Sequence, residues 1–353
     1  MAETGTQKAL AVNYKGGPFE LVRHAIWTPG PGEILVKIQG VGLNQSDWKF
    51  QTGVFDASGF IKDYPVFTGT DGAGTVVGVG EGVTRFSKGD RVLFQGWLTA
   101  ERTTFQEYAV VEAALTAKIP QTVTALETAS IPACVSTAAM IFWGSNLEGT
   151  GLKPFWEEDA EGYYSGKNKS ILIIGASSIT GLFGLQLAKY LGLGPIIVTS
   201  SLKHTEYLKS MGAAHVIDRS ADITPVVEKL KRELNIGIDF IFDAVHVPIT
   251  QTEVDLLSPN GVLMTIWVID PTLVFDDGRR GVPMTVALGR DKELKKQMYA
   301  RIESLLEKGK LMAARVEKID GGLGGIAEGL GKMERSEVSG VKLVVDPTET
   351  ADF

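Results

Sequence analysis

The stretch ILIIGASSITG, residues 171–181, joins an apolar run to a glycine and a group of small hydroxyl side chains. The apolar run predicts a buried strand, and the residues after it predict a helix that begins almost at once. A tight turn of this kind gathers unpaired backbone amides at the positive end of a helix, where a phosphate group binds. Because the spacing is not GxGxxG, we expect hydroxyl groups to supplement the amides. The expected phosphate-binding residues are Gly175, Ser177, Ser178, Ile179, Thr180 and Gly181.

A second chemical signal lies at the end of the next expected strand, which reads PIIVTSS. A unit that binds NAD carries Asp or Glu here, as an acceptor for the ribose 2′-hydroxyl. This chain has Ser200 and Ser201 instead, and Lys203 and His204 follow them. Hydroxyl groups and a cation suit a 2′-phosphate, which a carboxylate would repel. The sequence therefore predicts NADPH as the cofactor rather than NADH.

Metal ligands are scarce in the sequence. The chain has one cysteine, Cys134, so neither an internal disulfide framework nor a zinc site made of several cysteines can form. The four histidines, at positions 24, 204, 215 and 246, are scattered and form no cluster in the sequence. We expect no metal site, and we expect Cys134 to be a small buried apolar residue.

Length and composition limit the class of protein. The 353 residues, 44% hydrophobic and 22% charged, are enough for two sizeable cores. A net charge of −7 offers no basic face for nucleic acid or anionic lipid, so neither is an expected partner. The N-terminus has no signal pattern and no apolar stretch is expected to reach the length of a membrane span, so a cytoplasmic location is predicted.

The pattern of apolar residues and glycines changes along the chain. Residues 7–118 consist of short apolar runs broken by glycines, which is typical of a compact β-rich domain. From Ser170 onwards, strand-like and helix-like segments alternate, which indicates a doubly wound parallel sheet. A helix is expected within GRDKELKKQMYARIESLLEKGKL, and the strand-like tail SGVKLVVDP is expected to rejoin the first domain.

Four segments carry a resemblance to a known superfamily: YPVFTGTDGAGTVVGVG (64–80), KGDRV (88–92), IGASSITG (174–181) and MGAAHVID (211–218). In this order they resemble the medium-chain dehydrogenase/reductase superfamily. The stretch VGLNQSDWK (41–49), the insert between Trp143 and Ser170, and the tail SGVKLVV (339–345) resemble the fungal ToxD-like group, which includes trans-acting enoyl reductases and lies near the quinone oxidoreductases.

The resemblance implies an α/β protein of two domains with a cleft between them. A GroES-like, β-rich catalytic domain is expected over residues 1–133 and 285–353, and a Rossmann-type NADPH-binding domain over 134–284. In zinc-dependent members, the metal ligands lie in the segment that here reads NQSD, on Thr70 and near Ala133. None of these side chains offers a thiolate or an imidazole, so a zinc-independent enzyme is implied.

Without a metal, the chemistry that suits NADPH is hydride delivery to a carbon activated by conjugation, as in an enone or an enoyl thioester. The negative charge that develops on the carbonyl oxygen needs positioned donors. Quinone reduction remains an alternative, since the same geometry serves it. A protein that binds NADPH with little turnover, acting as an interaction module, is an alternative of another class.

The resemblance also implies roles for individual residues. Ser46 and Lys49 are expected beside the cofactor, Asn44 in the cleft and Thr137 near the nicotinamide ribose, and these four are the catalytic candidates. Further cofactor contacts are expected at Arg219, Ala244, Val245, Val341 and Lys342.

Other prominent residues are given structural interpretations. Asp47 is expected to accept hydrogen bonds from the amides of its own loop, Asp71 to partner a buried backbone group or cation, and Asp243 to cap a buried strand. The segment FWEEDAEGYYSG (155–166) is expected to be a solvated loop. The substrate is expected to be a small molecule, with presentation by a carrier left open, and the chain is expected to be a monomer or a homodimer.

Overall fold

The computed structural model describes residues 3–54, 63–144, 150–245, 248–283 and 292–353. Contacts divide the chain into two compact units. Unit 1 comprises 1–133 and 299–353, and unit 2 comprises 134–298. The second boundary of this division lies inside helix α8 (Lys292–Glu307). The boundary predicted from the sequence, 284/285, lies outside the described residues and stays a prediction.

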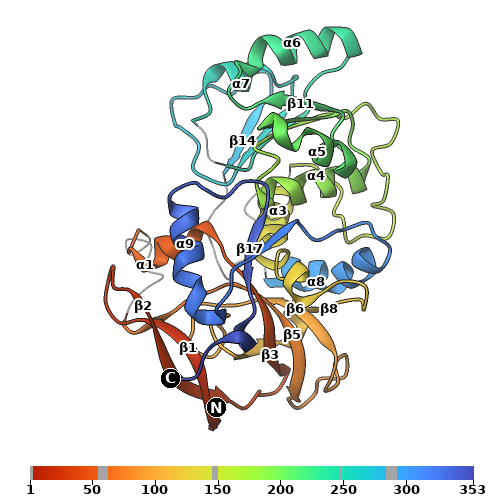
Figure 1. Ribbon diagram of the computed structural model, residues 1–353. Helices are drawn as coiled ribbons and strands as arrows, with labels where there is room; N and C mark the ends of the chain where they lie inside the picture. Colours follow the sequence, from red (N-terminus) through yellow and green to blue (C-terminus); the bar gives the residue numbers. More distant parts are fainter. Residues whose placement is uncertain (1–2, 55–62, 145–149, 246–247, 284–291) are drawn as a thin grey trace. The chain divides into compact units, whose positions relative to one another are not determined.

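Unit 1 is β-rich, as the glycine-broken apolar runs predict, and its strands pair in antiparallel fashion except for the parallel pairing of β16 with β17 (Figure 1). Its larger sheet has the strand order β16-β17-β3-β5-β6-β8, with β7 paired to β3, and its smaller sheet has the order β2-β1-β4. The strands are β1 (Glu3–Val12), β2 (Phe19–Trp27), β3 (Glu33–Gly42), β4 (Val66–Phe67), β5 (Asp71–Val79), β6 (Arg91–Gln95), β7 (Tyr108–Glu112), β8 (Thr116–Lys118), β16 (Val316–Lys318) and β17 (Lys342–Val345).

The helices of unit 1 are short. They are α1 (Gln45–Gln51), α2 (Ala125–Thr128) and α9 (Ile326–Glu334), while α3 (Pro132–Trp143) begins at the boundary between the units. Helix α9 packs beside α1 and supplies Leu330 and Met333 to the core that also contains Ile34 and Val36 of β3 (Figure 1). Strand β17 pairs with β3, so the prediction that the C-terminal tail rejoins the first domain is confirmed.

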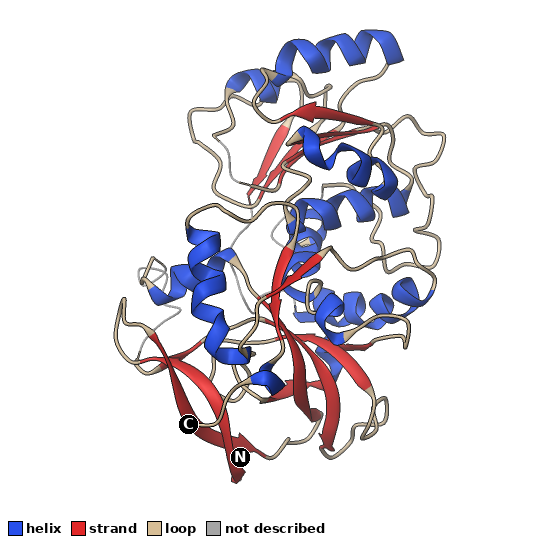
Figure 2. Cartoon of the chain, in the orientation of Figure 1, coloured by secondary structure: helices blue, strands red, loops and turns tan. Residues whose placement is uncertain are grey.

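Unit 2 is a six-stranded parallel sheet of order β11-β10-β9-β12-β13-β14 with helices on both faces (Figure 2). The predicted doubly wound arrangement is therefore confirmed. The strands are β9 (Ile171–Ile174), β10 (Ile196–Ser200), β11 (His215–Asp218), β12 (Phe240–Asp243), β13 (Val262–Thr265) and β14 (Arg280–Pro283). The helices are α4 (Ile179–Leu191), α5 (Thr205–Met211), α6 (Ile223–Leu234) and α7 (Gln251–Asp255).

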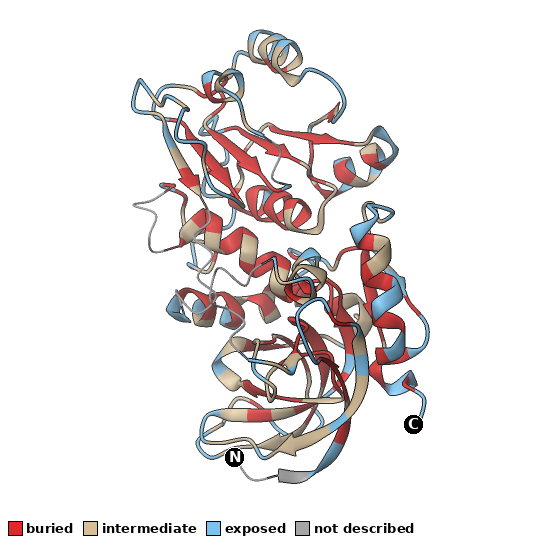
Figure 3. Cartoon of the chain, turned by 90° about the vertical axis from the view of Figure 1, so that its left-hand side faces the viewer, coloured by how far each residue is buried: buried red, intermediate tan, exposed pale blue. Residues whose placement is uncertain are grey.

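Strands β9, β10, β12 and β13 are buried along their whole length because both faces of the sheet are covered (Figure 3). On one face, α4 approaches so closely that a Cβ atom on Gly184 would lie 2.5 Å from the ring of Phe242. On the other face, Val227 of α6 and Val254 of α7 pack against residues such as Leu172. The sheet is thus held rigidly from both sides, which fixes the ends of its strands.

The insert before β9 is docked and not simply solvated, so the expectation for residues 155–166 is wrong. Phe155 is fully buried, and the amides of Gly162 and Tyr164 donate to the carbonyl groups of Tyr190 and Leu191 at the end of α4, each at 2.8 Å. Aromatic side chains provide apolar area to bury, while the acidic side chains of the segment remain outside and pair with Lys153.

The expectation that no apolar stretch is long enough to cross a membrane is also wrong. The 19 residues Ala125–Trp143, which contain α2 and α3, meet that test by length and composition. In the structure 67% of this apolar window is buried within the protein. A core helix of a soluble protein passes the same test, so the stretch is weak evidence for a membrane span.

Candidate functional site

The predicted phosphate-binding turn lies where the strand order of unit 2 reverses. Strand β9 lies in the middle of the sheet, between β10 and β12, so the connections after β9 and β12 leave the sheet side by side. In open α/β sheets, ligands bind outside the carboxyl ends of the strands at this point. The stretch from Gly175 to Gly181 leaves β9 there and enters α4.

Gly175 occupies a position that other residues fit poorly. Its φ is +78°, in the left-handed region, and a Cβ atom would lie 2.4 Å from the side chain of Val245 after β12. Its amide donates to Oγ1 of Thr199 at 3.0 Å, and the amide of Ala176 donates to the Thr199 carbonyl at 3.0 Å. Residues from three neighbouring strand ends thus fix the shape of the turn.

The hydroxyl group of Ser178 shapes the turn from within. Ser178 is the N-cap of α4, and its Oγ accepts the Gly181 amide at 3.0 Å and donates to the Ala244 carbonyl at 3.4 Å. This hydroxyl is therefore committed to the turn, which differs from the direct phosphate contact predicted for it. Gly181 is needed for the same close packing, because a Cβ atom there would lie 2.5 Å from the Gly175 carbonyl.

The amides of Ser177, Ile179 and Thr180 have no acceptor among the residues that the structure describes. They lie at the N-terminus of α4, a helix of 13 residues, where the helix dipole adds positive charge. The turn therefore fits the pyrophosphate of a dinucleotide, held mainly by backbone amides.

The residues predicted to select the 2′-phosphate lie at the carboxyl ends of β10 and β11. We call this edge of the sheet the rim. Ser200 ends β10 in register with Asp218 of β11, and the amide of Arg219 donates to the Ser200 carbonyl at 2.9 Å. The Asp218 carboxylate accepts both the amide and the hydroxyl group of Ser220, and these hydrogen bonds lower its pKa. Lys203, shortly after β10, and Arg219, directly after β11, are both exposed.

The remaining predicted residues of unit 2 lie in different settings. His204 is 7% exposed at the end of a short 3-10 helix, so its side chain points into the protein. Thr137 lies half-buried in α3, and its contact with the nicotinamide ribose stays a prediction. Asp243 accepts the Val245 amide at 3.1 Å and the Thr265 hydroxyl at 2.9 Å, which confirms it as a cap of a buried strand.

The predicted catalytic residues of unit 1 lie at helix α1. Asn44 is its N-cap, and Ser46 and Lys49 are half-buried on the helix itself. The Lys49 ammonium lies 5.6 Å from the centroid of the Trp48 ring and makes no ion pair within the described part of the chain. A donor without a competing carboxylate is what an incoming oxyanion would need.

A buried polar cluster, formed by Asn44, Asp47, Asp71 and Lys342, lies beside the start of α1; we refer to it as the cluster behind α1. The Lys342 ammonium donates to Oδ2 of Asp71 and to Oδ1 of Asn44, both at 2.7 Å, and the side chains of Lys342 and Asp71 are only 3% and 0% exposed. Asp71 Oδ1 accepts the Ala133 amide at 2.5 Å. The prediction that Asp71 partners a buried cation or backbone group is confirmed on both counts.

This cluster changes the roles expected for Asn44 and Lys342. The Asn44 side-chain amide donates to Asp71 at 2.8 Å and to the Thr70 hydroxyl at 3.2 Å, so both its N–H bonds already have acceptors. The structure gives Asn44 a structural role where the sequence predicted a donor to substrate. The Lys342 ammonium is likewise committed to the cluster, whereas a cofactor contact was expected; Val341, just before it, is half-buried.

Gly42 makes room for the cluster. It pairs with Asp71 of β5 on one side and Val344 of β17 on the other. A Cβ atom on Gly42 would lie 2.8 Å from Cε of Lys342 and 3.0 Å from Cβ of Asp71. The lysine stem can cross β3 only because this position has no side chain.

Asp47, in the first turn of α1, is fully buried, which the sequence did not predict. Its Oδ2 accepts the Asn44 amide at 2.7 Å, which confirms its anchoring role. Its Oδ1 is buried and accepts no hydrogen bond from the residues that the structure describes. Burial raises the pKa of Asp47 to about 7, against the lowering effects of the Asn44 amide and Lys342, and Asp71 raises it further.

The positions that bind zinc in metal-dependent relatives surround this cluster. Thr70 accepts from Asn44, and Ala133 donates its amide to Asp71. Within the described residues, no group of three or more His, Cys, Asp or Glu side chains is placed to hold a metal ion. Cys134 is buried, as expected.

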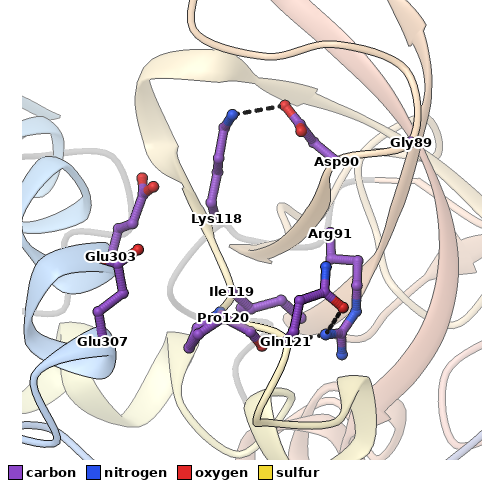
Figure 4. Close-up of a pocket in the computed structure, with 9 residues that line it drawn as sticks. All are labelled: Gly89, Asp90, Arg91, Lys118, Ile119, Pro120, Gln121, Glu303 and Glu307. Carbon is purple, nitrogen blue, oxygen red and sulfur yellow. Dashed lines mark hydrogen bonds and ion pairs between the residues drawn. The ribbon is translucent and has the colours of Figure 1, made fainter.

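A pocket of about 330 Å³ lies elsewhere in unit 1, between the β6–β8 region and α8 (Figure 4). Its Lys118 pairs with Asp90 at 2.9 Å, and its Glu303 pairs with Arg85 at 3.0 Å. None of the predicted site residues lines it. Because most of its charges are already paired, it offers little to a charged ligand.

Sequence reasoning missed the burial of Asp47 and the ammonium–carboxylate pair. A signal for the pair was present, since Lys342 opens the apolar run KLVV and therefore begins a buried strand with a charge. Charges that lie in buried strands require partners. Asp71, at the start of another apolar strand, is the complementary signal.

Two family matches cover much of the chain. Residues 30–121, in unit 1, match the family described as "Alcohol dehydrogenase GroES-like domain", which confirms the GroES-like fold expected there. Residues 180–282, in unit 2, match the family described as "Zinc-binding dehydrogenase".

Individual proteins are also similar to this chain in sequence or in fold. The chain is 33% identical over 226 residues to trans-enoyl reductase himH of Aspergillus japonicus (63% of this chain, 61% of himH). It is 29% identical over 366 residues to trans-enoyl reductase grgB of a Penicillium species (96% and 98%). It is 32% identical over 267 residues to the chloroplast envelope quinone oxidoreductase homolog of Arabidopsis thaliana (72% of each). Among solved structures, an alcohol dehydrogenase superfamily protein from Novosphingobium aromaticivorans has a similar fold, with a TM-score of 0.78 at 23% identity (96% and 99% covered).

We expect Lys342→Met to destabilise the protein by about 3 to 5 kcal/mol, because it leaves the Asp71 carboxylate buried without its cation. The double variant Lys342→Met/Asp71→Asn should recover part of this loss, since the buried charge is then removed as well. Urea unfolding at neutral pH measures both. The control is Lys332→Met, whose ion pairs with Glu328 and Glu317 lie at 3.5 and 3.8 Å near the surface and whose loss should cost under about 1 kcal/mol. Equal effects of Lys342→Met and Lys332→Met would contradict the assignment.

Proposed function

Because this chain belongs to the medium-chain dehydrogenase/reductase superfamily and is an oxidoreductase, we propose that it is an NADPH-dependent, zinc-independent reductase of activated C=C bonds. The substrate class is an enone or an enoyl thioester. The names of himH and grgB, both trans-enoyl reductases, support this proposal. The observation that carries it is the composition of the cluster behind α1.

That cluster has the wrong chemistry for a catalytic zinc. Asn44, Thr70 and Ala133 provide an amide, a hydroxyl and a backbone N–H. Of the two nearby carboxyl groups, Asp71 is neutralised by the Lys342 ammonium and Asp47 accepts the Asn44 amide. Zinc sites are built from thiolates, imidazoles and carboxylates free to bind it. A reductase with this donor set needs a substrate whose own conjugation activates the carbon that accepts hydride.

NADPH, when bound, supplies the hydride. The protein's part is to bind the dinucleotide at the turn after β9 and to present donors to the carbonyl oxygen where negative charge develops. Lys49 is the best-placed donor of α1, because its ammonium has no carboxylate partner among the described side chains. Ser46, one turn earlier on the same helix, adds a hydroxyl group.

Selection of NADPH over NADH is supported by the rim of β10. The last residues of the strand are serines, and the exposed Lys203 and Arg219 follow β10 and β11. The nearest strand-end carboxylate, Asp218, already accepts two hydrogen bonds from Ser220. Cations that can form charge-assisted hydrogen bonds with a phosphate therefore outnumber competing anions on this rim.

Quinone reduction is the second candidate. The similarity to a quinone oxidoreductase homolog of Arabidopsis thaliana favours it, and a quinone is also activated by conjugation. Presentation of the substrate by an acyl carrier belongs to the first candidate alone.

NADPH oxidation across a panel of enones, enoyl thioesters and quinones, with product identification, tests the proposal. We expect saturation of the C=C bond in an enone or an enoyl thioester. Turnover restricted to quinones would establish the second candidate. Tight NADPH binding with no oxidation by any acceptor would instead indicate an interaction module.

We expect NADPH to bind at least about tenfold more tightly than NADH, because charge-assisted contacts to the 2′-phosphate are each worth about 1.5 kcal/mol or more. The double variant Lys203→Gln/Arg219→Gln should weaken NADPH binding and leave NADH binding almost unchanged. Fluorescence titration gives both dissociation constants. Lys209→Gln, at an exposed lysine of the same unit, is the control. Equal affinities of the parent protein for the two cofactors would refute the assignment.

We expect Lys49→Met to lower kcat by about 10² to 10³, since it keeps most of the side-chain length but deletes the positioned donor. The fold should survive, as circular dichroism and a melting curve can verify. Lys88→Met, at an exposed lysine of unit 1, should change stability by under about 0.5 kcal/mol and leave kcat unaltered. A kcat for Lys49→Met within a factor of about two of the parent would show that Lys49 is a surface residue.

A further inference from the structure

The buried cluster behind α1 holds two carboxyl groups but one ammonium group. Asp71 is paired with Lys342 at 2.7 Å, while the carboxyl group of Asp47, fully buried beside them, accepts one hydrogen bond from the described residues, that of the Asn44 amide. Ionisation of both carboxyl groups would leave a net negative charge among buried side chains, which is strongly unfavourable. One proton on Asp47 makes the cluster electrically neutral.

The unpartnered oxygen of Asp47 points to the same conclusion. A buried carboxylate normally accepts several hydrogen bonds, yet no described residue donates one to Oδ1. An unsatisfied neutral hydroxyl costs far less than an unsatisfied charged oxygen. Geometry and charge balance thus favour the protonated form.

We propose that Asp47 is a positioning residue that carries a proton in the active form of the protein, and that loss of this proton loosens the hold on the start of α1. With the carboxyl group neutral, Asn44 keeps its bonds to Asp71, Thr70 and Lys342, and the helix starts from a fixed point. With the carboxyl group ionised, Asp47 repels Asp71 and competes with it for Lys342. Asn44, which is bonded to both partners, then shifts, and Ser46 and Lys49 move with it.

The charged groups around Asp47 are consistent with a transition near neutral pH. Burial raises the pKa of Asp47 to about 7, with Lys342 of β17 lowering it and Asp71 of β5 raising it. On α1 itself the other charge is Lys49. Helix α9, which packs against α1, has Lys332 and Glu328 paired at 3.5 Å on its outer side.

This inference rests on the proposed function only for its activity measurement, because the proton can be detected without turnover. The native pKa of about 7 lies above the ordinary value of 3.8, so between about pH 4 and 7 the folded protein binds more protons than the unfolded chain. Stability conferred by this proton is fully present below about pH 4 and is lost as the pH rises through 7. The folding equilibrium constant should fall by up to about tenfold per pH unit across this window.

The test compares the parent with Asp47→Asn, which keeps an acceptor for the Asn44 amide and cannot ionise. Urea unfolding from about pH 4.5 to 8.5 should show the parent losing stability relative to Asp47→Asn as the pH rises. Asp90→Asn is the matched control. Partial burial opposes it, but the Ser87 amide and Lys118 hold the pKa of Asp90 below its ordinary value, so this variant should parallel the parent over that range.

The second test measures kcat with the acceptor that the panel of enones, enoyl thioesters and quinones identifies. We expect kcat of the parent to decline by about threefold or more between about pH 6 and 8.5, and this decline to be absent in Asp47→Asn and retained in Asp90→Asn. Pure loss of packing would lower kcat at every pH and would not remove the decline. If no acceptor is reduced, the proposed function fails while the unfolding comparison still decides the state of Asp47.

A spectroscopic measurement covers the case in which Asp47→Asn does not fold. Difference infrared spectroscopy of the parent should show the carbonyl stretch of a protonated carboxyl group near about pH 6 that disappears by about pH 8.5. Parallel pH dependences of stability for the parent and Asp47→Asn, or the lack of this band in the parent, would overturn the proposal.

Discussion

The buried ion pair between Lys342 and Asp71 is the interaction on which the candidate site in unit 1 depends. It joins residues 271 positions apart and ties β17, β5 and, through Asn44, the start of α1 to one point. Removing two charges from water is costly, and the pair is stable only because its geometry is close and further donors satisfy the remaining oxygens. The Ala133 amide and the Asn44 side chain provide these donors. The C-terminal tail is therefore part of the site's foundation as well as of the sheet.

Unit 2 could be read from the sequence in detail because its signals are local. Apolar runs such as ILII and the turn that follows predict a buried strand and a helix start without knowledge of the rest of the chain. Once such segments alternate, the right-handed crossover rule leaves few possible strand orders. The tight turn between this strand and this helix, predicted to bind phosphate, also followed from the same pattern. What the pattern could not show is that the Ser178 hydroxyl also donates to the Ala244 carbonyl, since this depends on the approach of another strand end.

In unit 1 the sequence predicted the structural roles of acidic residues better than it predicted the groups with which they pair. Asp47 and Asp71 were correctly assigned to anchoring and pairing, because short acidic side chains in apolar surroundings must be satisfied. Asn44 was assigned to the substrate because its environment depends on Lys342, which is remote in sequence. The insert at 155–166 was misjudged for a similar reason: its acidic composition is visible locally, whereas its docking against α4 depends on a non-local surface. Pairings that span the chain lie beyond single-sequence reasoning.

The turn after β9 is shaped by the protein's own hydrogen bonds, from the Gly181 amide to Ser178 and from the Gly175 amide to Thr199. A dinucleotide therefore meets a loop that is already ordered. Fixing the backbone of a flexible residue costs about 1 to 2 kcal/mol in entropy, and here that cost falls on folding and not on association. The attraction between the pyrophosphate and the helix end is then not consumed in organising the loop, so the cofactor can be captured at a rate set by diffusion and electrostatic steering rather than by loop closure.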